Sequence, residues 1–147
     1  MASWRIAYGV RRIASEGGGK AGEMGFRFER LEIWKLAIEF ASRVYDVTEG
    51  FPKSEIFGLR ADVRRAGNSV PLNIGEGAGR GSRRDFSRFL DIALGSVHEV
   101  VTGMAIALNR RYVTPDQYQT TYARAELLAK KLTRFQDTLV PTRRGET

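Results

Sequence analysis

Arginine is the residue type whose placement in this chain most clearly indicates a chemistry. Seven of them lie in one stretch, at Arg60, Arg64, Arg65, Arg80, Arg83, Arg84 and Arg88. The acids of that stretch are Asp62, Glu76 and Asp85, so seven positive charges against three negative ones leave +4. Guanidinium groups bind phosphate through paired N–H donors, and the whole chain has a net charge of +7 and a pI near 10.1. These charges favour an anionic partner, with nucleic acid first and an acidic lipid surface second.

Three of these arginines crowd a glycine-rich turn with the sequence GAGRGSRRD. Gly79 and Gly81 permit close approach of the backbone, and free N–H groups at the start of the next helix also suit phosphate. We therefore predict that Arg80, Arg83 and Arg84 contact phosphate. The rest of the predicted nucleic-acid surface is Arg88, Arg60 and Arg65.

Other polar residues lie on or beside apolar stripes, where unpaired burial is costly, so we predict structural roles for them. Counting back from the turn places Arg64 opposite Glu99 on an antiparallel partner helix. We expect Arg64, or alternatively Arg65, to neutralise that carboxylate. Polar groups within the stripes should bond across the core or a subunit seam. The predicted polar network is Arg64, Ser69, Asn73, Glu76 and Glu99.

No arrangement of residues predicts catalysis or a metal site. His98 is the one histidine, and Gly95 stands three residues before it, so the Glu-x-x-His pair of a di-iron bundle is missing. Glu29 and Glu32 resemble half of a magnesium site, but first-turn acids of a helix explain them more simply. There is no phosphate-binding loop, no nucleophile elbow and no cysteine. We expect a protein that is not an enzyme and has no metal or cofactor.

Apolar residues that recur every three or four positions predict four helices, over residues 31–48, 54–79, 83–110 and 115–139. Ser82 is a predicted N-cap with Asp85 in the first turn, and Thr114 is another, followed by Pro115. Pro71 lies inside the second helix, where we expect a kink. Short connections between four amphipathic helices predict an all-α, antiparallel, up-down-up-down four-helix bundle.

The domain organisation follows from the same pattern. Residues 1–25 contain a run of glycines and no apolar repeat, so we predict a flexible tail, with Met1 and Met24 both open as the start of translation. Residues 26–140 form the predicted bundle and residues 141–147 a polar C-terminal tail. No apolar run approaches the length of a membrane span, and no signal peptide is evident. We therefore expect a cytoplasmic protein with no membrane contact.

The central hairpin carries a longer motif, which resembles the proteins encoded in 23S rRNA intervening sequences and the accessory variability determinant of diversity-generating retroelements. Its matching residues are Phe57, Gly58, Leu59, Arg64, Arg65, Ala66, Ser69, Pro71, Asn73, Ile74, Glu76, Gly77, Gly79, Arg80, Phe86, Phe89, Leu90, Ile92, Ala93, Gly95, Ser96 and Glu99. The opening of the bundle matches through Phe28, Leu31, Ile33 and Trp34. This resemblance implies a closed homopentamer of bundles and, in the retroelement members, binding of nucleic acid and of a reverse transcriptase.

This chain departs from the family pattern at a few positions. Gly67 and Gly75 stand where alanine is usual, which should loosen the second helix, and Val101 replaces a common glutamate. Two functions remain open because a fold does not fix a function. The first is a non-enzymatic, homo-oligomeric module that binds RNA or DNA through phosphates, as an accessory to a reverse transcriptase or in association with rRNA. The alternative is a scaffolding oligomer with a protein partner and no contact with nucleic acid.

Overall fold

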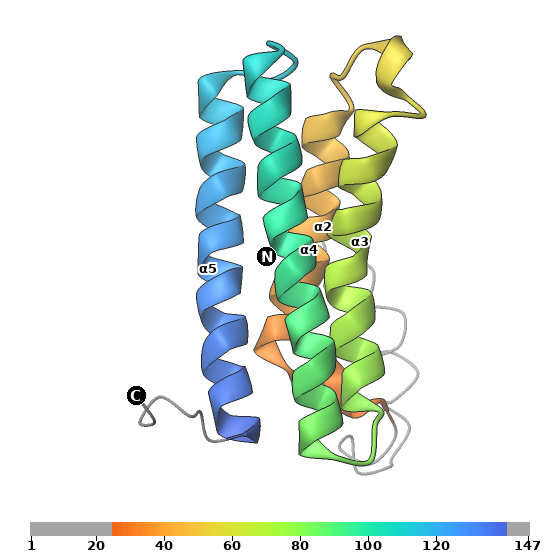
Figure 1. The fold of residues 1–147 in the computed structure, drawn as a ribbon, viewed down its shortest axis with the longest axis vertical. Coiled ribbons are helices and arrows are strands. Elements are labelled where there is room, and N and C mark those ends of the chain that lie inside the picture. Colours follow the sequence, from red (N-terminus) through yellow and green to blue (C-terminus); the bar gives the residue numbers. More distant parts are fainter. Residues whose placement is uncertain (1–24, 141–147) are drawn as a thin grey trace, which may run out of the picture.

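The computed structural model describes residues 25–140, so the N-terminal tail and the residues after Val140 lie outside the described part. Four long helices follow one another, and consecutive helices run antiparallel (Figure 1). They are α2 (Glu32–Thr48), α3 (Leu59–Ala78), α4 (Arg83–Asn109) and α5 (Pro115–Leu139). Two short 3-10 turns, η1 (Arg27–Arg30) and η2 (Lys53–Glu55), precede α2 and α3. The described residues contain no strand, which confirms the predicted all-helical bundle.

The second helix begins later than the sequence predicts. Pro52 leads into η2 rather than into the long helix, and α3 begins only at Leu59. A carboxylate from η2 then serves the helix start, since Glu55 Oε2 accepts a hydrogen bond from the backbone N of Leu59 at 3.0 Å. That contact satisfies one of the free N–H groups of the first turn. The residues between become a protruding connection that places Phe57 in solvent, 96% exposed.

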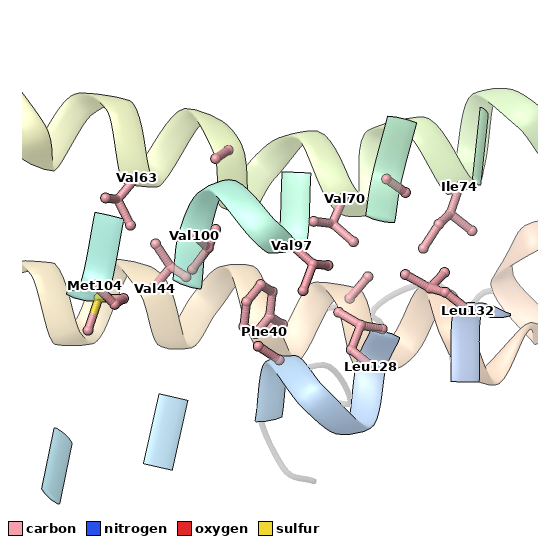
Figure 2. Close-up of a cluster of buried hydrophobic side chains, with 14 of the residues drawn as sticks. Phe40, Val44, Val63, Val70, Ile74, Val97, Val100, Met104, Leu128 and Leu132 are labelled. Carbon is pink, nitrogen blue, oxygen red and sulfur yellow. The ribbon is translucent and has the colours of Figure 1, made fainter. Parts of the chain in front are cut away.

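The core lies along the line where the apolar faces of the four helices meet (Figure 2). Val63, Val70 and Ile74 of α3 project into it, and Val97 and Val100 of α4 face them (Figure 2). Helices α2 and α5 complete the core. Their innermost residues include Ala37, Phe40, Val44, Ala125, Leu128 and Leu132. The predicted spacing of three and four residues therefore reports the buried faces correctly.

Glycines bring α3 and α4 into close contact. A Cβ on Gly103 would lie 2.5 Å from Val63 Cγ2, and one on Gly77 would lie 2.8 Å from Phe89 Cβ. Neither position can accept a side chain without a shift of its neighbour. Gly67 has a related role toward α2, because a Cβ there would approach Val44 to 3.3 Å. The prediction that Gly67 only loosens α3 is thus incomplete, since the glycine also permits close packing.

The helix ends behave largely as predicted. Ser82 caps α4 by accepting from the Asp85 backbone N at 3.1 Å. Thr114 and Gln117 form a reciprocal capping box at the start of α5, with Thr114 Oγ1 accepting at 3.1 Å and Gln117 Oε1 at 2.9 Å. Helix α3 continues through buried Pro71, and the kink expected there stays a prediction.

Helix α4 ends at a residue with a left-handed backbone conformation, which the sequence does not predict because that residue is an arginine. Arg111 has φ of 63°, in the left-handed region that favours glycine. The backbone N of Tyr112 donates to Ala107 O at 2.8 Å, and that of Arg111 donates to Leu108 O at 3.0 Å. These two bonds form a Schellman motif. Helix α4 therefore closes with arginine at the position where glycine is usual.

Helix α4 also has a property that the sequence analysis missed. Within the described residues it is the one helix long and apolar enough to cross a membrane, with a mean hydropathy of 1.4 over an 18-residue window, of which 44% is buried. The expectation that no run approaches this length is therefore wrong for α4. A core helix of a bundle meets the same criterion, and α4 packs against both α3 and α5. By itself this helix is weak evidence for a membrane span.

Candidate nucleic-acid interface

The arginines at the α3–α4 turn divide into two kinds. Arg80 donates to Glu76 Oε1 at 2.8 Å, and its guanidinium lies 4.9 Å from the ring centroid of Phe89. Arg88 donates to Asp85 Oδ1 at 3.2 Å and lies 4.8 Å from the same ring. Arg80, which we predicted to contact phosphate, is thus paired with Glu76, an acid four residues before it in the chain. These two arginines have ordered partners within the chain.

Arg83 and Arg84 occupy the first turn of α4, are exposed, and form no ion pair with a described residue. Arg84 borders a shallow hollow that also includes Asp85 and Asp91, so the local field beside it is mixed. Arg83 does not border that hollow. The positive end of α4 adds to both charges. Of the arginines predicted at this turn, these two are the best placed to reach an external phosphate.

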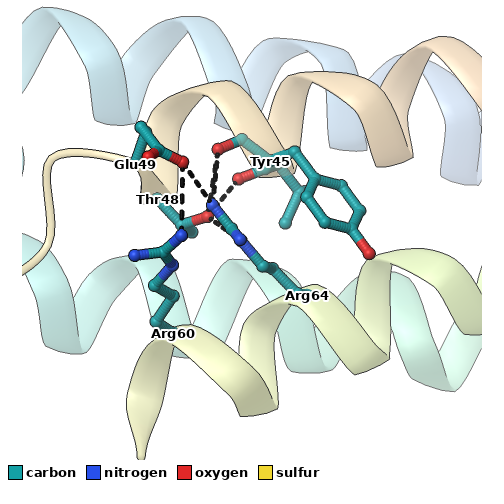
Figure 3. Close-up of polar contacts among 6 residues, drawn as sticks. Tyr45, Thr48, Glu49, Arg60 and Arg64 are labelled. Carbon is teal, nitrogen blue, oxygen red and sulfur yellow. Dashed lines mark hydrogen bonds and ion pairs between the residues drawn. The ribbon is translucent and has the colours of Figure 1, made fainter. Parts of the chain in front are cut away.

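Arg64 lies in a network that joins α3 to the end of α2, and not to α4 (Figure 3). Its Nε donates to Thr48 Oγ1 at 2.8 Å, and its Nη2 donates to Glu49 Oε2 at 2.9 Å and to Tyr45 O at 3.2 Å. The guanidinium also lies 4.6 Å from the Tyr45 ring centroid. The predicted pair between Arg64 and Glu99 is therefore wrong.

The rotation of α3 explains this correction. Positions 60, 64 and 68 share the side that faces α2, as shown by the Arg60–Glu49 pair at 3.3 Å and the bond from Asn68 Nδ2 to Tyr45 OH at 2.8 Å. Arg65 lies on the other side and borders the same hollow as Glu99, between α3 and α4. Its ion pair, however, is with Asp62 on its own helix. Counting along the chain therefore did not show that Arg64 faces α2, whereas Glu99 borders the hollow between α3 and α4.

Two members of the predicted polar network, Ser69 and Asn73, are hydrogen-bonded to each other in the structure. Ser69 Oγ accepts from Asn73 Nδ2 at 2.9 Å and from Ser96 Oγ at 2.8 Å, which links α3 to α4. Asn73 Nδ2 also donates to Ser69 O at 2.7 Å. Glu76 does not join this network, since it is exposed and pairs with Arg80. The missed member is Ser96, a buried serine whose position within the apolar stripe of α4 was the available signal.

The six predicted binding arginines do not form one surface. Arg60 and Arg65 lie near the start of α3, whereas Arg80 follows its end, and a rise of 1.5 Å per residue separates Arg60 from Arg80 by about 30 Å. Arg60 also keeps only 20% of its side chain exposed and is held by Glu49. The candidate interface is therefore confined to the turn between α3 and α4.

The described residues bring together no group of three histidines, cysteines or acids that could hold a metal ion. Glu32, half of the acidic pair considered above, is bound by Lys131 Nζ at 3.1 Å. His98 is exposed on α4.

Comparison with known proteins supports the architecture described above. Residues 29–134 match the model of the 23S rRNA-intervening sequence protein family. Among solved structures, the chain is similar to a protein of unknown function from the S23 ribosomal protein family of Bacteroides thetaiotaomicron, with 25% sequence identity and a TM-score of 0.66. The similarity covers 71% of this chain and 97% of that one. No curated protein matches. Because the family model spans well over half of its length, the chain belongs to the 23S rRNA-intervening sequence protein family.

Proposed function

We propose that this chain is a non-enzymatic, homo-oligomeric four-helix module that binds RNA or DNA through backbone phosphates. The observation that carries the proposal is the pair Arg83 and Arg84, which is exposed at the positive end of α4 and has no ion-pair partner among the described residues. The net charge of +7 would attract a polyanion to the whole molecule. Phosphate contacts position a protein without reading sequence, so little sequence preference is expected.

Fluorescence anisotropy with labelled single-stranded and duplex RNA and DNA tests this proposal across a salt series. Replacing Arg83 and Arg84 together by Ala should weaken binding and reduce the slope of log affinity against log salt by about one unit per lost phosphate contact. The double variant of Lys130 and Arg134 to Ala removes the same charge from α5 and serves as the control. Equal binding by the two double variants at every salt concentration would contradict a site at the turn.

Assembly into a closed homopentamer is part of the same proposal. Phe57 is 96% exposed and Leu72 69% exposed, so a second chain that packed on either residue would remove its apolar side chain from water. Several copies of the turn would then act together on one nucleic acid. Light scattering at micromolar concentration should give the mass of five chains, and Phe57→Ser should lower it. A monomeric wild-type chain would contradict this part.

The biological partner is proposed to be a reverse transcriptase or ribosomal RNA, as the family resemblance implies. A reverse-transcriptase gene or an rRNA insertion beside the coding sequence would distinguish these two roles. The exposed Phe57 and Leu72 also fit the alternative of a scaffold for a protein partner. An oligomer that shows no salt-dependent retention on heparin and no gel shift with RNA or DNA would favour that alternative.

A further inference from the structure

A hollow of about 720 Å³ lies between α3 and α4, and it is the one that Arg65 and Glu99 border. On α4 its lining extends from Ile92 to Ile106, which a rise of 1.5 Å per residue makes about 21 Å long. These two isoleucines are 44% and 48% exposed. The other apolar or glycine residues of the lining are Leu59, Val63, Ala66, Gly95 and Gly103. The hollow is therefore long enough for a peptide segment, which would remove both isoleucines from water.

The charged residues of this hollow are mainly acidic, although the chain as a whole is basic. Asp62 and Glu99 lie there with one arginine, Arg65, so with His98 counted as neutral the lining carries −1 in a chain of +7. Arg65 is paired with Asp62. Glu99 is exposed and forms no ion pair with a described residue. Phosphates would meet repulsion from such a lining, whereas a segment of apolar and basic side chains is complementary to it.

The chain contains a segment of this composition before the first described residue. Positions 4–13 hold five large apolar residues, three arginines and no acid. The apolar residues are Trp4, Ile6, Tyr8, Val10 and Ile13, and the basic ones are Arg5, Arg11 and Arg12. We infer that residues 4–13 dock in the hollow between α3 and α4 of their own chain, where their apolar side chains cover Ile92 and Ile106 and their arginines face Glu99. This contact is separate from the proposed phosphate contacts at the turn.

The place where the described chain begins is compatible with this docking. Eleven residues, 14–24, join the segment to Gly25, and they can span up to about 36–40 Å. Phe28 lies beside α3, because a Cβ on Gly75 would be 3.9 Å from its ring. Gly75 is six residues, or about 9 Å along the helix axis, from Ser69 in the lining of the hollow. A segment tethered this near to its site docks at a high effective concentration.

Protection of an engineered thiol tests the inference on the full chain, which has no cysteine of its own. Gly95→Cys places the thiol in the hollow, where nothing lies within 4 Å of the Cβ position. Its rate of alkylation by N-ethylmaleimide should rise at least tenfold when Arg5, Arg11 and Arg12 are all replaced by Glu, because the reversed segment no longer covers the hollow.

Lys130→Cys on α5 is the matched control. Lys130 is exposed and does not border the hollow. Its neighbour Lys131 contacts Glu32 Oε1 at 3.1 Å, at the helix start that follows η1, so this site is also within reach of the tether. The three glutamates should leave the alkylation rate of Lys130→Cys unchanged.

A mixture of chains identifies whose segment covers the hollow. A Gly95→Cys chain that carries the three glutamates is refolded with an excess of wild-type chain, and its thiol should stay reactive. Circular dichroism confirms that each variant is folded. Should Gly95→Cys fail to fold, Thr102→Cys, which is exposed in the same lining, replaces it.

Two results would overturn the inference. The first is an alkylation rate at position 95 that the three glutamates do not change, and protection of that kind which is lost on dilution would assign the hollow to a second copy of the bundle. The second is protection of the altered chain by wild-type chains, which would mean that the segment docks on a neighbour.

Discussion

Arg64 and Thr48 are sixteen residues apart in the sequence, and Arg64 Nε donates to Thr48 Oγ1 at 2.8 Å. Thr48 is fully buried at the end of α2, and its hydroxyl also donates to Val44 O at 2.7 Å. One hydroxyl thus satisfies a cation on α3 and a carbonyl on its own helix. The contact fixes how the start of α3 meets the end of α2 (Figure 3).

The Thr48 contact gives the first prediction. Thr48→Val keeps the shape of the side chain but removes the acceptor for Arg64, so the free energy of unfolding should fall by about 1–3 kcal/mol. Urea unfolding followed by circular dichroism measures this change. Thr121→Val is the control, because Thr121 is equally buried but bonds only to Gln117 O of its own helix. An equal loss in both variants would mean that the bond to Arg64 adds no stability.

Arg64 itself should affect stability and not nucleic-acid binding. Arg64→Ala removes the bonds to Thr48 and Glu49 and the stacking on Tyr45, and only 18% of the Arg64 side chain is exposed. We expect a lower melting temperature and a salt slope of binding close to that of the wild type. A salt slope reduced by about one unit would place Arg64 at a phosphate after all.

Replacement by alanine should change the stability of the chain in opposite directions at two glycines of α4. Gly103→Ala would place a Cβ 2.5 Å from Val63 Cγ2, so the packing of α3 on α4 should lose about 1–3 kcal/mol. Gly95 has nothing within 4 Å of its Cβ position, and Gly95→Ala should add up to about 1 kcal/mol through helix propensity. Melting temperatures of the two variants measure the difference. A destabilised Gly95→Ala oligomer would indicate that another chain packs at Gly95.

The left-handed residue that ends α4 gives another test. Arg111→Gly should raise the free energy of unfolding by up to about 1 kcal/mol, since glycine adopts φ of 63° without strain. Arg110→Gly is the matched control, because Arg110 has φ of −83° and gains nothing from glycine. Chemical denaturation of both variants measures the two free energies of unfolding. If both changes destabilise the chain equally, the strain at Arg111 is negligible.

The Arg83 and Arg84 pair should act on binding and leave folding unchanged. Their replacement by Ala removes exposed side chains that have no ion-pair partner in the described structure, so the melting temperature should stay within about 2 °C of the wild-type value. Arg80→Ala and Arg88→Ala remove guanidiniums that lie over Phe89. Those changes should cost about 0.5–1 kcal/mol each. A stability loss from the Arg83 and Arg84 pair as large as this would assign it a structural role.

The sequence alone determined the features that depend on local chemistry. Four helices follow from apolar residues at every third or fourth position, and the caps at Ser82 and Thr114 follow from side chains that reach the N–H groups of their own first turn. These contacts span three residues or fewer, so no distant segment has to be known. The family resemblance was equally accessible, because residue types and their spacing along the chain carry it, and the family model matches residues 29–134.

Only the tertiary structure decided which arginines have partners on another helix or at its end. Arg64 meets Thr48 and Glu49 rather than Glu99 because a helix turns by 100° per residue, so a count along the chain does not decide which neighbour a side chain faces. The buried Nε of Arg43 has no acceptor among the described residues, on a helix that packs against both α3 and α5. Both outcomes depend on the rotation and approach of whole helices. Those are set by close packing of many side chains at once.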